Sequence, residues 1–207
     1  MTIRLHPPEF LFPTKILSSE DTNFSSYRDD MIQWMIDYSY KHTTVAKSNQ
    51  GGYQSPDQFY LEESFAPYLN RISEHLISTI DEYTRDDRSC LHLDDLKLSN
   101  MWFNFNYENC YNVQHTHPGC VLSGVLWIQI PEEQPIVFSC FDEFTRATYE
   151  KYTNESLVAK EGQLLLFPAH LPHRVDINRS KNTRISISFN IIRTVSYTHL
   201  RAHETHE

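Results

Sequence analysis

The chain has 207 residues and a mass of 24.5 kDa, a size that suits one domain. Hydrophobic residues make up 40% and aromatic residues 13% of the sequence, which is enough for a sizeable core and excludes a largely disordered chain. The formal charge of -9, without any cluster of Lys and Arg, argues against a protein that binds duplex nucleic acid or an anionic membrane surface.

Cysteine spacing and the N-terminus exclude two further classes. The four cysteines, at positions 90, 110, 120 and 140, contain no CxxC pair and so predict neither a zinc ribbon nor a disulfide scaffold. The opening MTIRLHPPEF lacks the apolar run of a secretory signal, and no stretch of about 18 apolar residues follows. We therefore expect a cytoplasmic protein.

Two amphipathic helices are predicted in the first half of the chain. Apolar residues recur at helical spacing in two stripes: Met31, Trp34, Met35 and Tyr38, then Phe65, Tyr68, Leu69, Ile72, Leu76 and Ile80. Such stripes indicate packing against a core rather than a cofactor site. Between them, KSNQGGYQSPDQ has the composition of a loop. We expect residues of about 20–95 to form helical support.

After Asp95 the sequence predicts strands. Short runs rich in branched and aromatic residues are bounded by turn residues: KLSNMWFNFNY, VLSGVLWIQI, PIVFSCF, GQLLLFPAH and RISISFNII. Along RISISFNI, apolar residues alternate strictly with Arg184, Ser186, Ser188 and Asn190, so one face is apolar and the other polar. Strands without intervening helices favour a sandwich or jelly roll. We expect an α+β fold, mainly β in the second half, with a jelly-roll core over about 96–193.

The stretch YNVQHTHPGC contains the first candidate site. His115 and His117 stand two apart and are followed by Pro118-Gly119. On a strand both imidazoles project to the same face and can converge on one ion, at a strand end where a metal keeps open coordination positions. Alone, the HxH pattern is also compatible with exposed or hydrogen-bonded strand histidines.

Two later segments add candidates. LLLFPAHLPHRV places His170 and His173 in a turn punctuated by prolines, and either could supply a third ligand. Arg184 is followed at period two by Ser186, so a guanidinium and a hydroxyl share one face of the next strand. This pair suits a carboxylate, because Arg binds that group in bidentate fashion and Ser adds a donor. An isolated Arg would equally suit a surface salt bridge.

The order of these motifs resembles that of the Fe(II)- and 2-oxoglutarate-dependent dioxygenases of the double-stranded β-helix fold. HxH comes first, a distal His follows 58 residues later, and RxS comes last. The blocks NVQHTHPGCVLSGVLWIQIP, EGQLLLFPAHLPHRVDIN and TRISISFNI look like those of a 2-oxoglutarate/Fe(II) oxygenase family of bacteria and phages, in the prolyl-hydroxylase-like superfamily. The opening EFLFPTKI is also similar, so the resemblance runs from about Phe10 to Ile192. For a phage-encoded protein the compartment would be the host cytoplasm.

The resemblance implies a role for each matching residue. His115 corresponds to the first iron ligand and His173 to the distal one, while His117 stands where many related oxygenases have Asp. His117 either ligates iron or lies behind the ligands, with a water or a remote acid completing the site. Arg184 corresponds to the residue that pairs with the far carboxylate of 2-oxoglutarate, and Ser186 to its hydroxyl partner.

The implied activity is that of a dioxygenase, a hydroxylase in the simplest case, using Fe(II) as cofactor and 2-oxoglutarate as cosubstrate. Oxidative decarboxylation of 2-oxoglutarate to succinate and CO2 would be coupled to oxidation of a prime substrate that the sequence does not specify. Weaker site candidates are Asn104, Tyr107, Asn112, His170 and Asn190. Two alternatives stay open: a three-His iron dioxygenase that does not use 2-oxoglutarate, and a non-catalytic cupin-like binding protein. Neither duplex nucleic acid nor a membrane is an expected partner.

The last residues, VSYTHLRAHETHE, differ in pattern from the rest, and we expect a separate origin for them. They are polar and rich in His, and they lack the period of a strand or a helix. Val195 to Thr205 matches one reading frame of a common transposase-type sequencing adapter, and Thr194 also fits. We therefore expect a single oxygenase domain over 1–193 and an adapter-derived tail over 194–207, whose histidines are excluded from the candidate site.

Overall fold

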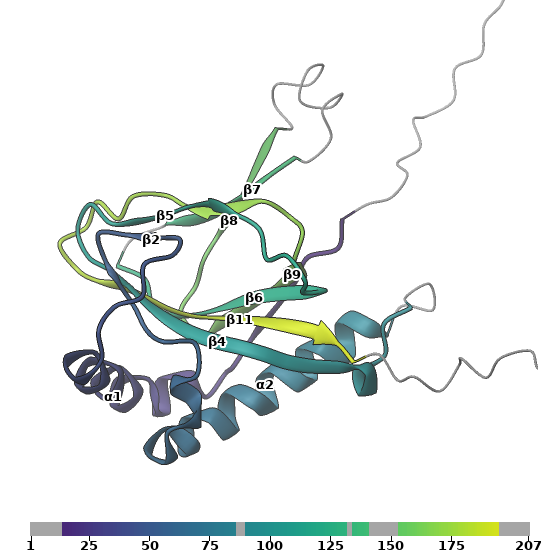
Figure 1. Cartoon of the computed structure of the whole chain (residues 1–207), viewed down its shortest axis with the longest axis horizontal. Helices are drawn as coiled ribbons and strands as arrows, with labels where there is room; N and C mark the ends of the chain where they lie inside the picture. Colours follow the sequence, from purple (N-terminus) through teal and green to yellow (C-terminus); the bar gives the residue numbers. More distant parts are fainter. Residues whose placement is uncertain (1–13, 86–89, 132–133, 141–152, 195–207) are drawn as a thin grey trace, which may run out of the picture.

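The computed structural model describes residues 14–85, 90–131, 134–140 and 153–194 (Figure 1). Its helices and strands, in chain order, are β1 Leu17–Glu20, α1 Arg28–Lys41, β2 Asn49–Gln50, β3 Tyr53–Gln54, α2 Ala66–Thr84, β4 Leu96–Asn106, β5 Tyr111–His115, β6 Leu122–Gln129, β7 Pro135–Ser139, β8 Asn154–Val158, β9 Gln163–Pro168, β10 His173–Val175 and β11 Arg184–Arg193. Within the described ranges, no helix has the length and apolar character needed to span a membrane. The segment from Val195 onward, which we attribute to an adapter, lies outside these ranges.

The two predicted helices are confirmed. α1 buries Met31, Met35 and Tyr38, and α2 buries Ile72, Leu76 and Ile80, as the stripes indicate. Each helix turns its apolar side to the same sheet (Figure 1). The first half of the chain is thus helical support for a β structure.

The segment predicted as a loop between the helices contains two short strands, so that prediction was wrong in this respect. β2 and β3 have two residues each, which is too short for side-chain alternation to reveal. Gly51 joins them with a φ of 80°, and a Cβ on Gly52 would collide with the carbonyl oxygen of Phe105 on β4. The glycine pair therefore lets the chain turn between β2, which pairs with β5, and β3, which pairs with β4.

The strands form two antiparallel sheets. One has the order β1-β9-β6-β11-β4-β3, and the other has the order β2-β5-β10-β7-β8. β11 lies in the middle of the first sheet, where it pairs with β4 on one side and β6 on the other. The two sheets lie over each other, with both helices beyond the outer face of the first (Figure 1). This is the expected jelly roll with supporting helices.

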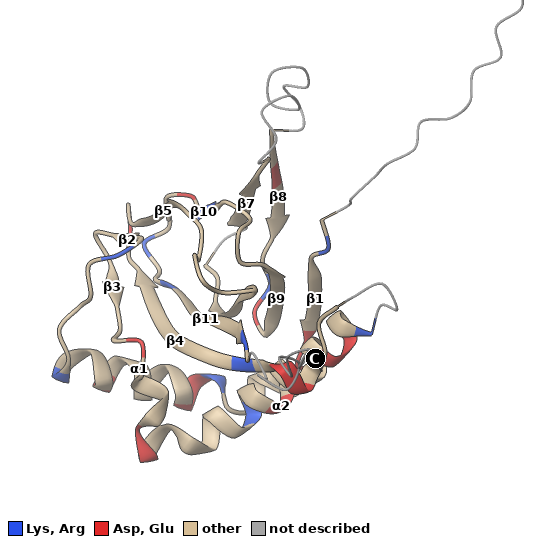
Figure 2. Ribbon diagram, turned by 45° about the vertical axis from the view of Figure 1, so that its right-hand side comes forward, with Lys and Arg blue, Asp and Glu red and all other residues tan. Residues whose placement is uncertain are grey.

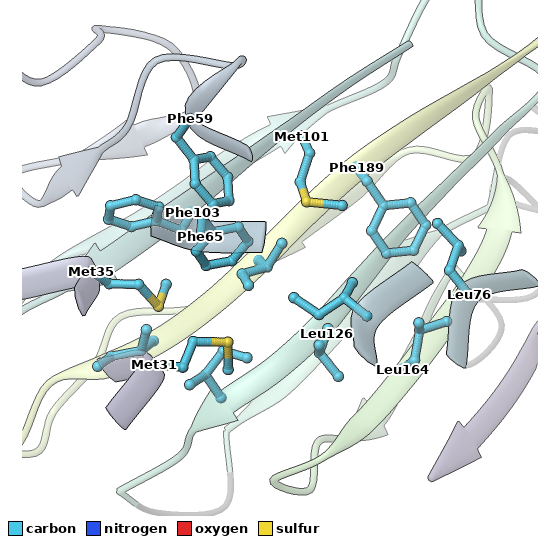
Figure 3. Packing of buried hydrophobic residues seen from close by; sticks show 14 of the residues in the cluster. Met31, Met35, Phe59, Phe65, Leu76, Met101, Phe103, Leu126, Leu164 and Phe189 are labelled. Atoms are coloured by element: carbon cyan, nitrogen blue, oxygen red, sulfur yellow. The ribbon is translucent and has the colours of Figure 1, made fainter. Parts of the chain in front are cut away.

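The main apolar core lies between the helices and the six-stranded sheet (Figure 3). Its fully buried members include Met31, Phe59, Phe65, Phe103, Leu126, Leu164, Ile187 and Phe189. A Cβ on Gly124 of β6 would collide with the ring of Phe189 on β11, so the glycine admits this ring. Burying so many large side chains supplies the principal driving force for folding.

The inner face of the same sheet is different, because it faces the second sheet and carries polar residues. The alternation of RISISFNI is confirmed: Ile185, Ile187 and Phe189 join the main core, while Ser186 and Ser188 line an internal cavity. Charged side chains lie mainly on the helices and at strand ends, and the strands themselves carry few (Figure 2). The polar face of β11 is therefore enclosed between the sheets rather than exposed to solvent.

Candidate functional site

Strand pairing brings His115 and His173 together. His115 is the last residue of β5 and His173 is the first residue of β10, and the two are direct partners across the antiparallel pair. Cross-strand partners place their Cβ atoms about 4.5–5.5 Å apart. The imidazole centroids are 4.4 Å apart. Two histidines separated by 58 positions in sequence are thus neighbours because of sheet register.

His117 joins them from outside the strand, which corrects the expectation that both HxH residues lie on it. β5 ends at His115, and the backbone N–H of His117 donates to the carbonyl of Ala169 at 2.9 Å. The ring of His117 lies 4.9 Å from that of His115, and its Nε2 is 3.3 Å from Nε2 of His173. Pro118 and Gly119 follow in a turn, so the chain bends here and the third imidazole turns toward the other two.

His173 also differs from its expected place. It begins β10 rather than lying in a turn, and it is only 5% exposed, between the rings of Phe138 and Phe167. His170 does lie in the turn and is exposed, outside the histidine cluster. Of the two histidines in FPAHLPHRV, the second therefore joins the histidine cluster and the first does not.

The hydrogen bonds suit metal coordination through Nε2. Nδ1 of His115 lies 2.7 Å from the carbonyl of Val113, and Nδ1 of His173 lies 2.9 Å from the carbonyl of Leu171. A carbonyl only accepts, so each Nδ1 carries the proton and each Nε2 presents a lone pair. This arrangement is typical of histidines that ligate a metal.

Burial keeps the imidazoles neutral. Burial and the neighbouring histidines lower the pKa of His117 to about 3 and that of His173 to about 4. Burial also lowers the pKa of His115, although the hydrogen bond to Val113 opposes this shift. Neutral imidazoles are the form that binds metal.

The three histidines are the one group of metal-ligating side chains found in the described part of the chain, with ligand atoms within 4.8 Å of one another. No Asp or Glu of the described residues joins this group, and none lines the cavities that it borders. Nitrogen ligands of this kind suit Fe(II), Zn(II) or Cu(II) rather than Mg(II) or Ca(II). The donor set therefore fits Fe(II), without the carboxylate that many related sites contain.

An internal cavity of about 30 Å³ extends from the histidines between the two sheets. Its lining includes Asn104, Asn112, Ser186 and Trp127, all of them buried. Asn112 donates to Ser48 at 3.3 Å, and Asn104 accepts from Asn49 at the same distance. Three of the residues predicted for the site thus lie beside the histidine cluster.

Arg184 lies two residues before Ser186 on the same face of β11 and is only 1% exposed. Its Nη1 donates to the side chain of Gln134 and to the carbonyl of Asp176, and its Nε donates to Asn106 at 3.4 Å. Nη2 has no acceptor among the described residues. A buried donor without a partner costs roughly 1–3 kcal/mol, and more when charged.

The charge of Arg184 is also without a counter-ion. No ion pair of Arg184 with an acid occurs among the described residues, and the Asp176 carboxylate pairs with Arg174 instead. Burial accordingly lowers the pKa of Arg184 to about 10, against the opposing attraction of Asp176. The group remains a cation at neutral pH. A buried guanidinium with a free N–H and no carboxylate partner fits a carboxylate ligand.

Trp127 is a residue that the sequence analysis missed. It pairs with Ser186 across β6 and β11, lines the internal cavity and is almost fully buried. Its indole N–H, like Nη2 of Arg184, has no acceptor among the described residues. The signal was present in VLSGVLWIQI: Ser123, Val125 and Trp127 alternate with the residues of the main core, which puts Trp127 on the inner face.

The remaining candidates lie apart from the internal cavity. Tyr107 is 45% exposed and lines a separate cavity with residues of α1. Asn190 is buried at the mouth of the histidine site, where it donates to Asn100 at 3.0 Å and accepts from Ser123 at 2.8 Å. The structure thus assembles most of the predicted residues but not Tyr107 or His170.

Solved structures with this fold include several oxygenases. HygX from Streptomyces hygroscopicus, with nickel and 2-oxoglutarate bound, has a TM-score of 0.61 at 12% identity over 87% of this chain and 84% of its own. A Pseudomonas putida prolyl-4-hydroxylase has a TM-score of 0.59 at 13% identity, covering 88% and 94%. The viral collagen prolyl hydroxylase vCPH from Paramecium Bursaria Chlorella virus-1 has a TM-score of 0.55 at 13% identity, covering 87% and 96%. Identities this low show a shared fold.

The sequence itself identifies the class. Residues 100–190, which include all three clustered histidines and Arg184, match the model of the family described as "Putative 2OG-Fe(II) oxygenase". No match was found among curated proteins. The fold, the histidine cluster and this match together define a 2-oxoglutarate-dependent non-haem iron oxygenase. Within that class, residues 100–190 are similar to the family whose model they match.

Proposed function

We propose that the chain is a hydroxylase in which His115, His117 and His173 hold Fe(II), while Arg184, Ser186 and Trp127 hold 2-oxoglutarate. The observation that carries this proposal is the pair of buried donors, Arg184 Nη2 and Trp127 Nε1, for which the described part of the chain offers no acceptor. Both donors belong to the inner face of the sheet, and Trp127 lines the cavity that the histidines border. A carboxylate there would satisfy both.

The metal and cosubstrate supply the oxidising chemistry, with succinate and CO2 as the products of 2-oxoglutarate. The residues of the chain bind and orient. His115 and His173 are held by backbone carbonyls, so their Nε2 atoms are fixed in direction before a metal arrives. Arg184 is held by Gln134 and Asn106, which leaves Nη2 for the ligand. The site is thus ordered in advance on the metal side and on the carboxylate side.

Three neutral histidines leave the full positive charge on Fe(II). A site with two His and one carboxylate would reduce that charge by one. With His117 as the third ligand, the carboxylate of 2-oxoglutarate nearer the metal would supply the missing negative charge. The far carboxylate would offset Arg184. The two carboxylates of 2-oxoglutarate would therefore complement Fe(II) and Arg184. Neither the histidine cluster nor Arg184 has an Asp or Glu carboxylate as a partner among the described residues.

Binding must be accompanied by movement. A cavity of about 30 Å³ has room for one or two water molecules but not for a five-carbon diacid. Lining side chains, among them the bulky indole of Trp127, must shift to admit 2-oxoglutarate. We expect the fluorescence of this indole to change when the cosubstrate binds.

Anaerobic titration with Fe(II) and 2-oxoglutarate tests the proposal directly. We expect a visible metal-to-ligand charge-transfer band with both present, and succinate once air is admitted. Arg184→Met should weaken 2-oxoglutarate binding roughly 10- to 100-fold, because each charge-assisted hydrogen bond contributes about 1.5–3 kcal/mol. Iron binding should persist in this variant.

Arg193→Met is the matched control, since Arg193 lies on the same strand but is exposed and pairs with Asp95 at 3.5 Å. This variant should bind 2-oxoglutarate normally. Iron binding with no response to 2-oxoglutarate would instead favour the three-His dioxygenase, which the all-nitrogen donor set also suits. Protein that ignores every divalent metal would favour the non-catalytic binding protein.

A further inference from the structure

A second cavity, of about 370 Å³, opens beside the histidine cluster. It shares Ser48, Trp102, His115 and His117 with the internal cavity. Its volume lies within the range of small-molecule sites, roughly 300–1,000 Å³. A molecule bound there would lie against His115 and His117. We refer to it as the outer pocket.

The outer pocket carries one charged side chain. Among the described residues that line it, Lys47 is the one Lys, Arg, Asp or Glu, although the whole chain has a formal charge of -9. Its ammonium is close enough to His117 to contribute to the lowered pKa of that imidazole. The ion pair of Lys47 with Asp57 is long, at 3.9 Å, and half exposed. Such pairs contribute about 0–1 kcal/mol, so the ammonium can readily exchange Asp57 for an anionic ligand.

Gln54 offers an unused acceptor in the same pocket. Its residue is 2% exposed, and its Oε1 has no donor among the described residues. The backbone of Gln54 is fixed on both sides. Its N–H donates to Thr44 Oγ1 at 2.9 Å, and the residue pairs with Asn104 on β4. Leaving a buried amide oxygen unpaired costs roughly 1–3 kcal/mol. A ligand N–H or O–H would remove that cost once the buried amide turns toward the pocket that Gln54 lines.

The other polar groups of the pocket do not demand a ligand. Asn190 donates to Asn100 at 3.0 Å, and Asn100 donates to Asp57 at 3.3 Å. These side chains satisfy one another and form a fixed wall. Trp102 supplies an apolar wall, with its ring centroid 5.7 Å from that of His117. The unmet requirements of the pocket are therefore one anion for Lys47 and one donor for Gln54, with a hydrophobic portion against Trp102.

We propose that the outer pocket binds the prime substrate, and that this substrate is a small free carboxylic acid with an N–H or O–H donor, such as an α-amino or α-hydroxy acid. This inference rests on the proposed function. The carboxylate would pair with Lys47, the donor would bind Gln54 Oε1, and the carbon portion would lie along Trp102 toward the histidines. A peptide segment lacks the free carboxylate, and a wholly apolar substrate would leave both polar groups unpaired.

Relaxation measurements on the protein loaded with Mn(II) and 2-oxoglutarate test this proposal without turnover. Mn(II) is paramagnetic and broadens the proton resonances of molecules bound near it. The probes are L-amino acids with neutral side chains, the corresponding α-hydroxy acids, and the same amino acids as C-terminal amides. We expect at least one free acid to be broadened, and its amide to bind at least 10-fold more weakly.

Matched variants connect the result to the pocket. Lys47→Gln should weaken the bound acid at least 10-fold, and Gln54→Met should weaken it several-fold, with 2-oxoglutarate binding unchanged in both. Lys160→Gln is the control, because Lys160 is also an exposed lysine with one long ion pair, 3.6 Å to Glu20. Lys160 is not among the residues that line the outer pocket, and its replacement should have no effect.

Several outcomes would overturn the proposal. They are amides that bind as well as acids, no broadened acid in the panel, an unaffected Lys47→Gln, or a loss of 2-oxoglutarate rather than acid binding in that variant. Failure of the proposed function looks different, since Mn(II) would then not broaden 2-oxoglutarate itself. The two failures are therefore distinguishable in one set of spectra.

Discussion

The two faces of the six-stranded sheet use the same strands for different purposes. The outer face packs against α1 and α2 in a large apolar cluster, whereas the inner face has a smaller apolar cluster and a set of buried polar groups. On β11, Ile187 and Phe189 belong to the first, and Arg184 and Ser186 to the second. The outer face is built mainly from apolar side chains, although Tyr53 Oη there has no partner among the described residues, whereas the inner face leaves N–H donors of Arg184 and Trp127 without acceptors. Neighbouring residues along one strand thus serve the apolar core and the proposed ligand site in turn.

A substitution on the outer face should have the largest effect on stability. Phe189→Ala should cost about 3–5 kcal/mol, because the fully buried ring fits beside Gly124 and its loss leaves a cavity. Urea unfolding monitored by circular dichroism measures this cost. Folded variant protein should keep its affinity for Mn(II). A marked loss of metal affinity would show that the two faces are not independent.

A substitution at the metal end of the inner face should act on binding. His173→Ala should lower metal affinity by more than about 100-fold, since even residues that only orient metal ligands contribute 10- to 100-fold. Equilibrium titration with Fe(II) under anaerobic conditions measures this affinity. His170→Ala, in the turn just before β10, should leave it unchanged. Equal losses in the two variants would contradict the assignment of His173.

Trp127→Phe tests the unpaired indole. The variant keeps an aromatic ring, smaller than the indole, and removes the N–H that has no acceptor among the described residues. We expect 2-oxoglutarate affinity to fall by roughly 5- to 10-fold, the loss of one neutral hydrogen bond of about 1–1.5 kcal/mol, with metal affinity unchanged. Isothermal titration calorimetry provides both values. Unchanged 2-oxoglutarate affinity together with a more stable apo protein would remove Trp127 from the site.

The smallest expected effect concerns His75 on the helical side. Its Nε2 lies 2.8 Å from Ser19 Oγ, and burial lowers its pKa below the usual 6.5, against the opposing charge of Asp21. The unfolded chain therefore takes up a proton first as the pH falls. The contribution of neutral His75 is fully present above pH 6.5 and is lost as the pH falls toward the lower folded pKa. Between pH 7.5 and 5, the free energy of unfolding should decline less steeply in His75→Gln than in the unmodified protein. Equal slopes in the two proteins would show that His75 does not cause the decline.

Local pattern was sufficient to predict much of the fold. Helical stripes located α1 and α2, and the alternation in RISISFNI placed Arg184 and Ser186 together on the inner face. Short strands were not predictable, because β2, β3 and β10 contain two or three residues and are held by pairing with distant strands. Tertiary pairing also explains why the turn expected at His173 is the start of a strand.

The site was only partly predictable for a related reason. Residue type and order pointed to His115, His173 and Arg184, since their chemistry is unusual on any strand. Proximity came from register, which pairs His115 with His173, and from the bend after β5 that brings in His117. Trp127 and Gln54 were missed because an indole or an amide in a strand looks like ordinary packing, and only the structure reveals that each has an unpaired polar atom.

The unpaired guanidinium of Arg184 has a consequence for how long the protein survives. If 2-oxoglutarate binds only the folded chain, it shifts the unfolding equilibrium by RT ln(1 + [L]/Kd), which is about 2.7 kcal/mol at a concentration 100-fold above Kd. Degradation that proceeds through the unfolded chain would slow correspondingly. The abundance of the enzyme would then follow the supply of a central metabolite, even before any substrate is oxidised.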